Sequence, residues 1–466
     1  MADSYTKEFE AVAAKAIDAY KSGDLIYAES CWREALKLKP YHVGARHNLG
    51  VLLARKNEHN AAIETFNMVI KAKPDHARAH ANRAGILRAT GNMRGALAGY
   101  QTAIEIDPNF FQAYVAKGDA LFFWQRFTEA VEAYDAVLLR NENYLGALRG
   151  RALALLALGD EAAALNDFEK IFLVRASLEF RPSKISRLKL RHDLDQLSYS
   201  GKGKKYAKIL SNLESEIHWP EDENEPVRLS KTWSKSLEEF FNQPTNIVLA
   251  EKVSEPLTVK AISILNSLDE IKDGPQIIDG LLHEDALKML RYYLLKSTIW
   301  NDFTHIDGFV ATYLETGLAS PLFLQLVTAL RQTSAFRNLP LVQGWAFKGV
   351  SSEARIGMHS DEAKLSLNIW LTPDNANLEP EHGGLIVHRH LPPADWSLSN
   401  YSDDKARIEK WILQKNTDSL EIPYRENRAV IFDSRLFHGS GSMKFADGYE
   451  NQRINITLLF GHSRKL

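Results

Sequence analysis

Two side chains near the start of the last quarter of the chain have the spacing of a metal-binding pair. His359 and Asp361 are two residues apart, so on an extended segment both project to the same side. A second imidazole, His438, follows the strand-like run Ala429–Asp433, where a rigid scaffold can direct it into the mouth of a site. Two imidazoles and one carboxylate form the facial ligand set that holds ferrous iron and leaves positions open. We therefore predict these three residues as metal ligands and as the catalytic centre.

A permanent cation follows this predicted ligand set. Arg453 lies fifteen residues after His438, at the predicted start of a strand, and its planar guanidinium suits a carboxylate. The alternative is a structural His359–Asp361 pair to which His438 is unrelated. Three further histidines, His382, His388 and His390, are expected to be solvated or packing residues, because neither cysteine nor helical His-x3-His spacing accompanies them.

The elements that must position these side chains follow Asp273-Gly274-Pro275. Helices are predicted over Glu284–Lys296 and Ser320–Thr333. Short runs with the residue types of strands come next, separated by turn residues, and cover Leu341–Val350, Leu365–Leu371, Gly384–Val387, Ala429–Phe432 and Arg453–Phe460. Several short strands after helices favour an antiparallel sandwich or jelly roll with helical support.

Alternation within two of these strands separates an aliphatic face from a polar one. In the second predicted strand the polar face carries Ser366 and Asn368, and in the last it carries Arg453 and Asn455. The aliphatic faces should pack against a neighbouring layer, which leaves the polar faces to line either solvent or a wet cavity. In the cavity interpretation, Asn368, Arg453 and Asn455 lie beside a bound ligand.

The combination of His359-x-Asp361, a histidine after a later strand and an arginine on the last strand resembles the Fe(II)/2-oxoglutarate-dependent dioxygenase superfamily, over about residues 276–466. The helices before the strands resemble its prolyl-hydroxylase-like branch. The resemblance implies a domain at residues 274–466 with a double-stranded β-helix and supporting helices. The chain departs from that branch at Arg453, where many of those enzymes have lysine, and in an insert at about Pro392–Pro423. Both departures concern the substrate more than the chemistry.

The same resemblance implies the cofactors and the reaction. Fe(II) would be held by the three predicted ligands, and 2-oxoglutarate would chelate it through its keto acid end. Arg453 would pair with the distal carboxylate, with Asn368 and Asn455 beside the co-substrate. With O2 as oxidant, 2-oxoglutarate would give succinate and CO2 while a C–H bond is hydroxylated.

The first part of the chain is an array of repeats with a period of 34 residues. Alanine recurs at that spacing, a large aromatic residue follows four positions later, and a small residue precedes the alanine by twelve. The alanines are Ala28, Ala62, Ala96, Ala130 and Ala164, the aromatics Trp32, Phe66, Tyr100, Tyr134 and Phe168, and the small residues Ala16, Gly50, Ala84, Gly118 and Ala152. Small residues let antiparallel helices approach closely, and the aromatic fills the gap to the next unit. Glycines at 23, 91 and 159 suit turns that need positive φ.

This pattern resembles the tetratricopeptide repeat, with five units over residues 7–176. The resemblance implies a superhelix whose concave face holds a peptide or a partner protein. In this register Asn48 and Asn82 occupy equivalent positions, with His47 beside the first, and are candidates for peptide binding. The alternative is that they are ordinary solvated polar residues.

Residues 177–273 lose the repeat period and are interpreted as a helical cap or connector. A basic cluster that includes Arg187, Lys189 and Arg191 is expected to form a solvated helix face rather than a partner site. The fold class predicted for the whole chain is therefore multidomain α+β: an N-terminal α-solenoid, a helical connector and a C-terminal jelly roll.

Composition limits the classes of partner. Of the 466 residues, 45% are hydrophobic and 25% charged, and the formal net charge is −2, so no basic field predicts nucleic acid or an anionic membrane as a partner. Cys31 is the single cysteine, which fits a reducing compartment, and a cytoplasmic location is expected. The leading hypothesis is a hydroxylase acting on a polypeptide side chain presented by the repeats. The alternatives are the same chemistry on a small molecule, with the repeats used for assembly, and a non-catalytic repeat scaffold.

Overall fold

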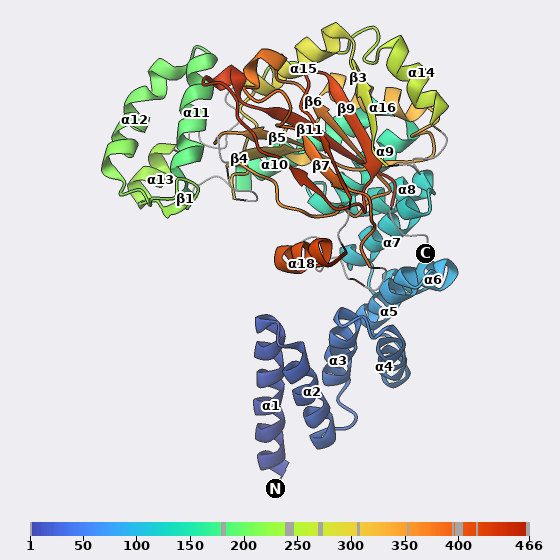
Figure 1. Cartoon of the computed structure of the whole chain (residues 1–466). Coiled ribbons are helices and arrows are strands. Elements are labelled where there is room, and N and C mark those ends of the chain that lie inside the picture. The colour runs from blue at the N-terminus through green and yellow to red at the C-terminus, as the bar shows by residue number, and fades with distance from the viewer. Residues whose placement is uncertain are drawn as a thin grey trace. The chain divides into compact units, whose positions relative to one another are not determined.

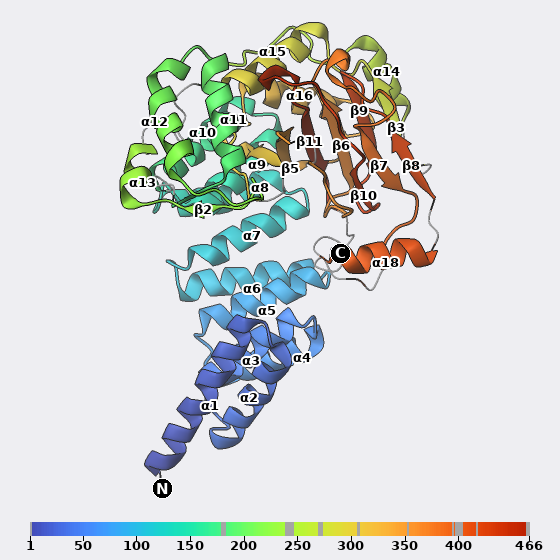
Figure 2. The same cartoon turned by 60° about the vertical axis from the view of Figure 1, so that its left-hand side comes forward.

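The computed structural model describes residues 2–178, 183–237, 247–268, 274–304, 308–351, 354–393, 396, 404–415 and 418–462 (Figures 1 and 2). Residues 1–151 form one compact unit and residues 152–464 another. The second half of the fifth repeat therefore packs with the C-terminal region. None of the helices in the described ranges is long and apolar enough to cross a membrane.

The repeat region consists of antiparallel helix pairs in sequence order. Its helices are α1 (Ala2–Ser22), α2 (Leu25–Leu38), α3 (Val43–Arg55), α4 (His59–Ala72), α5 (Ala77–Ala89), α6 (Met93–Ile106), α7 (Phe111–Phe123), α8 (Phe127–Leu138), α9 (Leu145–Leu158) and α10 (Glu161–Leu178). Side chains at helix starts supply missing hydrogen bonds; Asp24 accepts one from the amide of Tyr27, and Asn92 one from Gly95. The N-terminal region is thus a helical solenoid, as the period predicts.

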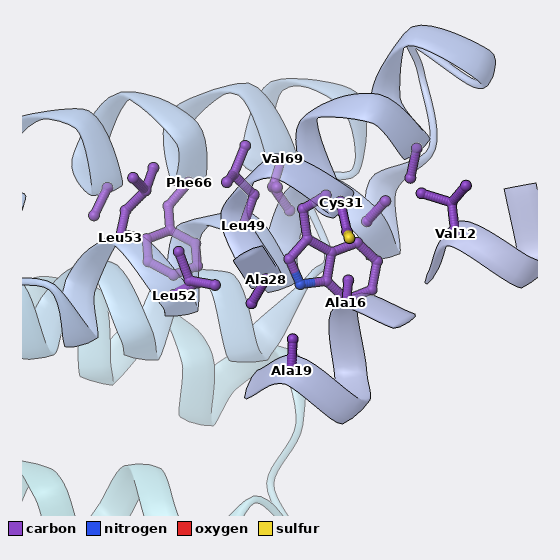
Figure 3. Packing of buried hydrophobic residues seen from close by; sticks show 14 of the residues in the cluster. Val12, Ala16, Ala19, Ala28, Cys31, Leu49, Leu52, Leu53, Phe66 and Val69 are labelled. Carbon is purple, nitrogen blue, oxygen red and sulfur yellow. The ribbon is translucent and has the colours of Figure 1, made fainter. Parts of the chain in front are cut away.

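Packing explains the residue types of the repeat. The alanines of the 34-residue series are all 0% exposed, and the aromatics that follow them are buried. Figure 3 shows this core around Ala28, Leu49 and Phe66. A Cβ added to Gly118 would lie 2.6 Å from the Tyr134 ring, and one added to Gly150, in the next unit, 2.3 Å from it. The aromatic residue thus fills the space between successive helix pairs, which requires small residues on both sides.

The turn within each helix pair has the same left-handed backbone in all five repeats. Gly23, Gly91 and Gly159 have φ of 87°, 83° and 89°, as predicted. At the equivalent positions of the second and fourth repeats, Asn57 and Gln125 have φ of 62° and 59°. Asparagine tolerates this conformation better than most residues, whereas glutamine does not, so the fourth turn carries backbone strain.

The connector contains α11 (Arg187–Tyr199), α12 (Gly203–Glu216), α13 (Lys231–Leu237) and α14 (Val259–Ser267), with a two-stranded sheet of β1 (Lys184–Ile185) and β2 (Val227–Arg228). Helix α11 packs on the C-terminal region, where Gln196 donates a hydrogen bond to the carbonyl of Ser297. Arg187 and Arg191 pair with Glu214 and Glu223, respectively.

The expected solvated face is wrong for Lys189. This residue is 2% exposed and forms an ion pair with Asp193 one turn later, because α11 turns this side towards the C-terminal region.

The C-terminal region is built on two antiparallel sheets. The larger sheet has the order β3-β9-β6-β11-β5-β4 and the smaller one β10-β7-β8. The strands are β3 (Gln276–Asp279), β4 (Phe309–Tyr313), β5 (Leu341–Gly349), β6 (Leu365–Trp370), β7 (Leu385–His388), β8 (Ser419–Ile422), β9 (Arg428–Asp433), β10 (His438–Ser440) and β11 (Ile454–Phe460). The five predicted strands are confirmed to within one residue at each end, and β3, β4, β8 and β10 were not predicted.

Apolar side chains from both sheets form one cluster between them, including Trp370 of β6, Val387 of β7 and Phe432 of β9. The opposite face of the larger sheet is covered by helices, and Phe336, in the turn after the second of them, packs on Phe460 of β11 with ring centroids 4.6 Å apart. These helices are α15 (Glu284–Lys296) and α16 (Pro321–Gln332), both as predicted. The region also contains the short 3-10 helices η1 (Leu314–Thr316), η2 (Asp374–Ala376) and η3 (Tyr449–Asn451). The predicted insert contains α18 (Lys405–Lys415); its residues 394–395, 397–403 and 416–417 lie outside the described ranges.

Candidate metal centre

The three predicted ligands are brought together by backbone pairing between two distant segments. His359 and His438 form a single antiparallel bridge, in which each amide donates to the other's carbonyl at 3.0 and 2.8 Å. The amide of Asp361 donates to the carbonyl of Ser434 at 2.8 Å. β10 in turn pairs with β7, so the second histidine is fixed to the smaller sheet. The pairing aligns the two imidazoles side by side, with ring centroids 4.3 Å apart.

The ligand atoms converge closely enough for one cation. Nε2 of His438 lies 3.3 Å from Oδ2 of Asp361, and Nε2 of His359 lies 3.8 Å from Oδ1. All three ligand atoms lie within 4.8 Å of one another, and no other such group of His, Cys, Asp or Glu occurs among the described residues. The prediction that these three side chains share one site is therefore matched by their geometry.

Hydrogen bonds at the far side of each ring determine which nitrogen faces the site. Nδ1 of His359 lies 2.9 Å from the carbonyl of Gly357, and Nδ1 of His438 lies 2.9 Å from that of Leu436. A carbonyl can only accept, so each Nδ1 carries a proton and Nε2 is the ring nitrogen that faces Asp361. This is the tautomer that a metal-ligating histidine needs.

The carboxylate is held in its charged form. Burial alone would raise the pKa of Asp361, but His438 first, then His359 and the Ser366 hydroxyl, bring it below its usual range. Ser366 donates to Oδ2 of Asp361 at 3.1 Å and also contacts the hydroxyl of Ser434 at 2.9 Å. Both serines orient the ligand, yet sequence reasoning did not assign them to the site. The one available signal was the position of Ser366 on the polar face of its strand.

Arg453, the residue predicted to bind a carboxylate, is a buried cation. It is 3% exposed and lies just before β11, donating from Nε to the carbonyl of Gly383 at 2.9 Å and from a terminal nitrogen to Asn455 at 3.0 Å. The rings of Trp370 and Tyr424 lie 5.9 and 6.0 Å from the guanidinium. Burial lowers the pKa of Arg453 to about 10, with Tyr424 acting in the opposite direction. Among the described residues, the hydrogen-bond partners of the guanidinium are the Gly383 carbonyl and the Asn455 amide, and neither is a carboxylate.

The polar faces of β6 and β11 meet in the interior. Asn455 donates to Thr457, and Thr457 donates to Asn368 at 2.7 Å. Asn368 and Asn455 are 6% and 2% exposed, so these faces do not line solvent. They connect the surroundings of Arg453 with the strand that carries Ser366.

The additional histidines lie outside the ligand group. His382 pairs with Glu421 at 2.7 Å on the surface, and that carboxylate raises the pKa of the imidazole. His388 is buried at the end of β7, and burial lowers its pKa. His390 is exposed. These positions agree with the expectation of packing and solvated residues.

In the repeat array, the predicted peptide-binding residues gather around one imidazole. Asn82 donates to Nε2 of His47 at 3.1 Å, and Asn48 also hydrogen-bonds to His47. The ring of His76 stacks on His47 with centroids 4.9 Å apart. Burial, followed by His76, lowers the pKa of His47. The three residues thus form one polar cluster on α3 and α5, and their role in peptide binding remains a prediction.

Ferrous iron fits the chemistry of the donor set. Two imidazole nitrogens and one carboxylate are the ligands of a facial triad, and the described residues supply no thiolate or fourth ligand to the group. Such a set leaves positions for further ligands, as an oxygenase requires, whereas a closed structural zinc site uses four.

Comparison with known proteins identifies the N-terminal region. The sequence profile of the tetratricopeptide repeat family matches residues 13–75, 60–109 and 115–177, so this region consists of tetratricopeptide repeats. A search of curated proteins found no match. Solved structures with similarity include MamA (20% identity, 35% of this chain and 96% of that chain, TM-score 0.33) and YrrB, described as a tetratricopeptide repeat protein with an unusual peptide-binding site (19%, 38% and 94%, 0.31). A repeat protein from Parabacteroides merdae is also similar (20% identity, 45% and 76% coverage, TM-score 0.33).

Proposed function

We propose that the chain is an Fe(II)- and 2-oxoglutarate-dependent oxygenase that hydroxylates a side chain of a protein or peptide recruited by its repeats. The observation that carries this proposal is the convergence of His359, Asp361 and His438, with the Nε2 atoms of both histidines facing the carboxylate. The two antiparallel sheets with a helical cover support the double-stranded β-helix fold that such an enzyme would have.

Each residue would have a separate task. The triad would hold the iron, and Ser366 and Ser434 would keep the Asp361 carboxylate oriented towards it. Arg453 would bind the distal carboxylate of 2-oxoglutarate, with Asn368 and Asn455 fixing the polar surface beside it. Bound there, iron, 2-oxoglutarate and O2 would supply the oxidation that hydroxylates a C–H bond. The apolar cluster between the sheets would limit the access of water.

The proposal is tested by succinate release from 2-oxoglutarate with Fe(II) and O2, comparing the wild type with His359→Ala. We expect turnover only in the wild type, because the variant lacks one ligand. A matched control is His390→Ala, which changes an exposed histidine outside the group and should behave as the wild type. Equal succinate production by the wild type and His359→Ala would exclude the enzymatic function.

A non-catalytic repeat scaffold is the second candidate, and the match to tetratricopeptide repeats favours it because such arrays bind proteins. The two candidates differ in turnover and agree in partner binding. The same chemistry on a small molecule, with the repeats used for assembly, is a third candidate that shares the metal centre.

Recruitment by the repeats is tested with Asn48→Ala combined with Asn82→Ala. The pair should weaken capture of a polypeptide substrate by about tenfold, since each lost hydrogen bond contributes about 0.5–1.5 kcal/mol. Substrate-uncoupled decarboxylation of 2-oxoglutarate should not change. Unchanged affinity of the double variant would refute the role of these asparagines in binding. The substrate itself can be found by mass spectrometry of captured proteins, as a 16 Da gain in mass that depends on Asp361.

A further inference from the structure

Helix α18 packs an apolar face behind the metal centre. Ile408 is 0% exposed, and Trp411 and Ile412, on the same face, are partly buried. With Trp396, Met358 and Phe437 they form the α18 cluster. The indole of Trp411 lies 5.4 Å from the ring of Phe437 and 6.2 Å from that of Trp396, measured between centroids. Figure 2 shows α18 beside the ends of β7 and β10.

The two residues that the helix contacts each precede a metal ligand. Met358 comes directly before His359, and Phe437 directly before His438. Neighbouring side chains on paired extended segments point to opposite faces. The imidazoles therefore occupy one face of this pair of segments, while Met358 and Phe437 occupy the other and meet α18.

A third contact reaches the backbone that orients one imidazole. A Cβ added to Gly357 would lie 3.4 Å from Cε of Lys405, so the aliphatic part of this lysine packs on the glycine. The carbonyl of Gly357 accepts the hydrogen bond from Nδ1 of His359. The start of α18 thus packs on the residue that determines the tautomer of the first ligand.

The segment that carries His359 needs such support. Its bridge to His438 is isolated, and few backbone hydrogen bonds hold it to β10, whereas β10 itself is fixed to β7. A metal site requires its ligands to be held within about 0.5 Å, which depends on packing of the residues behind them.

We propose that α18 is a positioning element of the metal centre, in which Trp411 and Ile408 press on Phe437 and Met358 and thereby set the separation of the two imidazoles. The inference rests on the proposed function, since it assumes that the triad binds metal. It assigns a role to the insert, which the resemblance to known oxygenases leaves without one.

The test is a titration of the full chain with Co(II), whose visible absorption reports coordination geometry. Trp411→Ala should weaken Co(II) binding about tenfold or more and change the absorption bands, as loss of supporting contacts does at other metal sites. Trp411→Phe should restore most of the affinity because it keeps an aromatic contact. Leu413→Ala is the matched control: it lies on the same helix but is 79% exposed, and should bind as the wild type.

A second control separates positioning from general destabilisation. Phe336→Leu removes packing from the helical side of the larger sheet, away from the ligand segments, and should lower the midpoint of thermal unfolding without changing the Co(II) spectrum. Unchanged affinity and spectrum in Trp411→Ala would overturn the inference, as would an equal loss of affinity in Phe336→Leu at the same loss of stability. Absence of Co(II) binding by the wild type would instead refute the metal centre itself.

Discussion

The repeat array and the candidate metal centre bring their characteristic side chains together in opposite ways. In the array, Phe66 and Tyr134 occupy the same position of different units, and each contacts small residues on the helices beside it. In the metal centre, His359 and His438 are far apart in sequence and meet only through antiparallel pairing. The array depends on local repetition, and the centre depends on topology. Changes in the array should therefore alter stability first, and changes in the centre should alter chemistry first.

The largest expected effect on stability is that of Phe66→Ala. Phe66 is 0% exposed in the core of the array, and truncation of a buried phenylalanine costs about 3–5 kcal/mol. Urea denaturation followed by far-UV circular dichroism should show that residues 1–151 unfold at a lower urea concentration than in the wild type. Met68→Ala, on the same helix but at a 53% exposed position, is the control. Because residues 152–464 form their own compact unit, Co(II) affinity should not change in Phe66→Ala. A parallel loss of Co(II) affinity would contradict the independence of the two units.

Arg453→Met tests whether a change near the candidate metal centre alters chemistry before stability. It should raise the KM for 2-oxoglutarate about 100-fold, because a charge-assisted hydrogen bond contributes about 1.5–3 kcal/mol and the distal carboxylate would lose its cation. Metal affinity should remain, since Arg453 is not a ligand. Arg428→Met is the control: this arginine pairs with Asp279 of the neighbouring strand and should not affect the KM. A KM that stays at the wild-type value in Arg453→Met would assign the buried cation a structural role.

The same contrast explains what could be predicted from the sequence. A fixed period located the helices of the array and the turn glycines, because each contact there is made within one repeat or with the next. Residue type and spacing found His359, Asp361 and His438, and strand parity found the polar face with Asn368 and Asn455. β10, with the sequence His-Gly-Ser, was missed because its extended form comes from pairing with β7 rather than from its own propensity.

Contacts that depend on the assembled fold could not be found in this way. Ser434 reaches Ser366 only after the turn following β9 closes on β6, and a serine in a turn has many other uses. Lys189 was expected in solvent because its neighbours Arg187 and Arg191 are basic. Its burial follows from the packing of α11 on the C-terminal region, which local sequence does not specify.

One buried lysine, Lys348, lies in the compact unit of residues 152–464. Lys348 of β5 is 0% exposed, its Nζ lies 3.0 Å from the centroid of the Tyr449 ring, and that nitrogen has no hydrogen-bond partner within the described ranges. Burial lowers its pKa well below the usual value, with Asp195 only partly opposing this effect. Lys348→Met should stabilise the second unit by about 2 kcal/mol at pH 7, in the range found when buried charged groups are replaced by apolar ones.

The pH dependence of this stabilisation follows from the lowered pKa of Lys348 in the folded chain. The unfolded chain keeps the lysine proton up to a pH of about 10.4, whereas the folded chain releases it at lower pH. In the wild type, stability therefore rises with pH between the lowered folded pKa and about 10.4, since the unfolded state binds more protons there. The advantage of Lys348→Met should shrink between pH 7 and pH 10, measured by urea denaturation. An advantage that is constant with pH would show that Lys348 stays charged in the folded protein.

The smallest effect tests whether the repeats are equivalent. Gln125 has φ of 59° at the turn where three other repeats have glycine, and a left-handed backbone costs a non-glycine residue about 1–2 kcal/mol. Part of this is offset because glycine loses more conformational freedom on folding, so Gln125→Gly should stabilise the array by about 1 kcal/mol. Gly91→Ala, at φ of 83°, should destabilise it by a similar amount, and Asn57→Gly should change less because asparagine tolerates this backbone. Equal and opposite effects in urea denaturation would show that a turn residue can be exchanged between units, as no ligand of the metal centre can. A loss of stability in Gln125→Gly would mean that contacts particular to the fourth repeat outweigh its strain, and that the period describes the sequence better than the energetics.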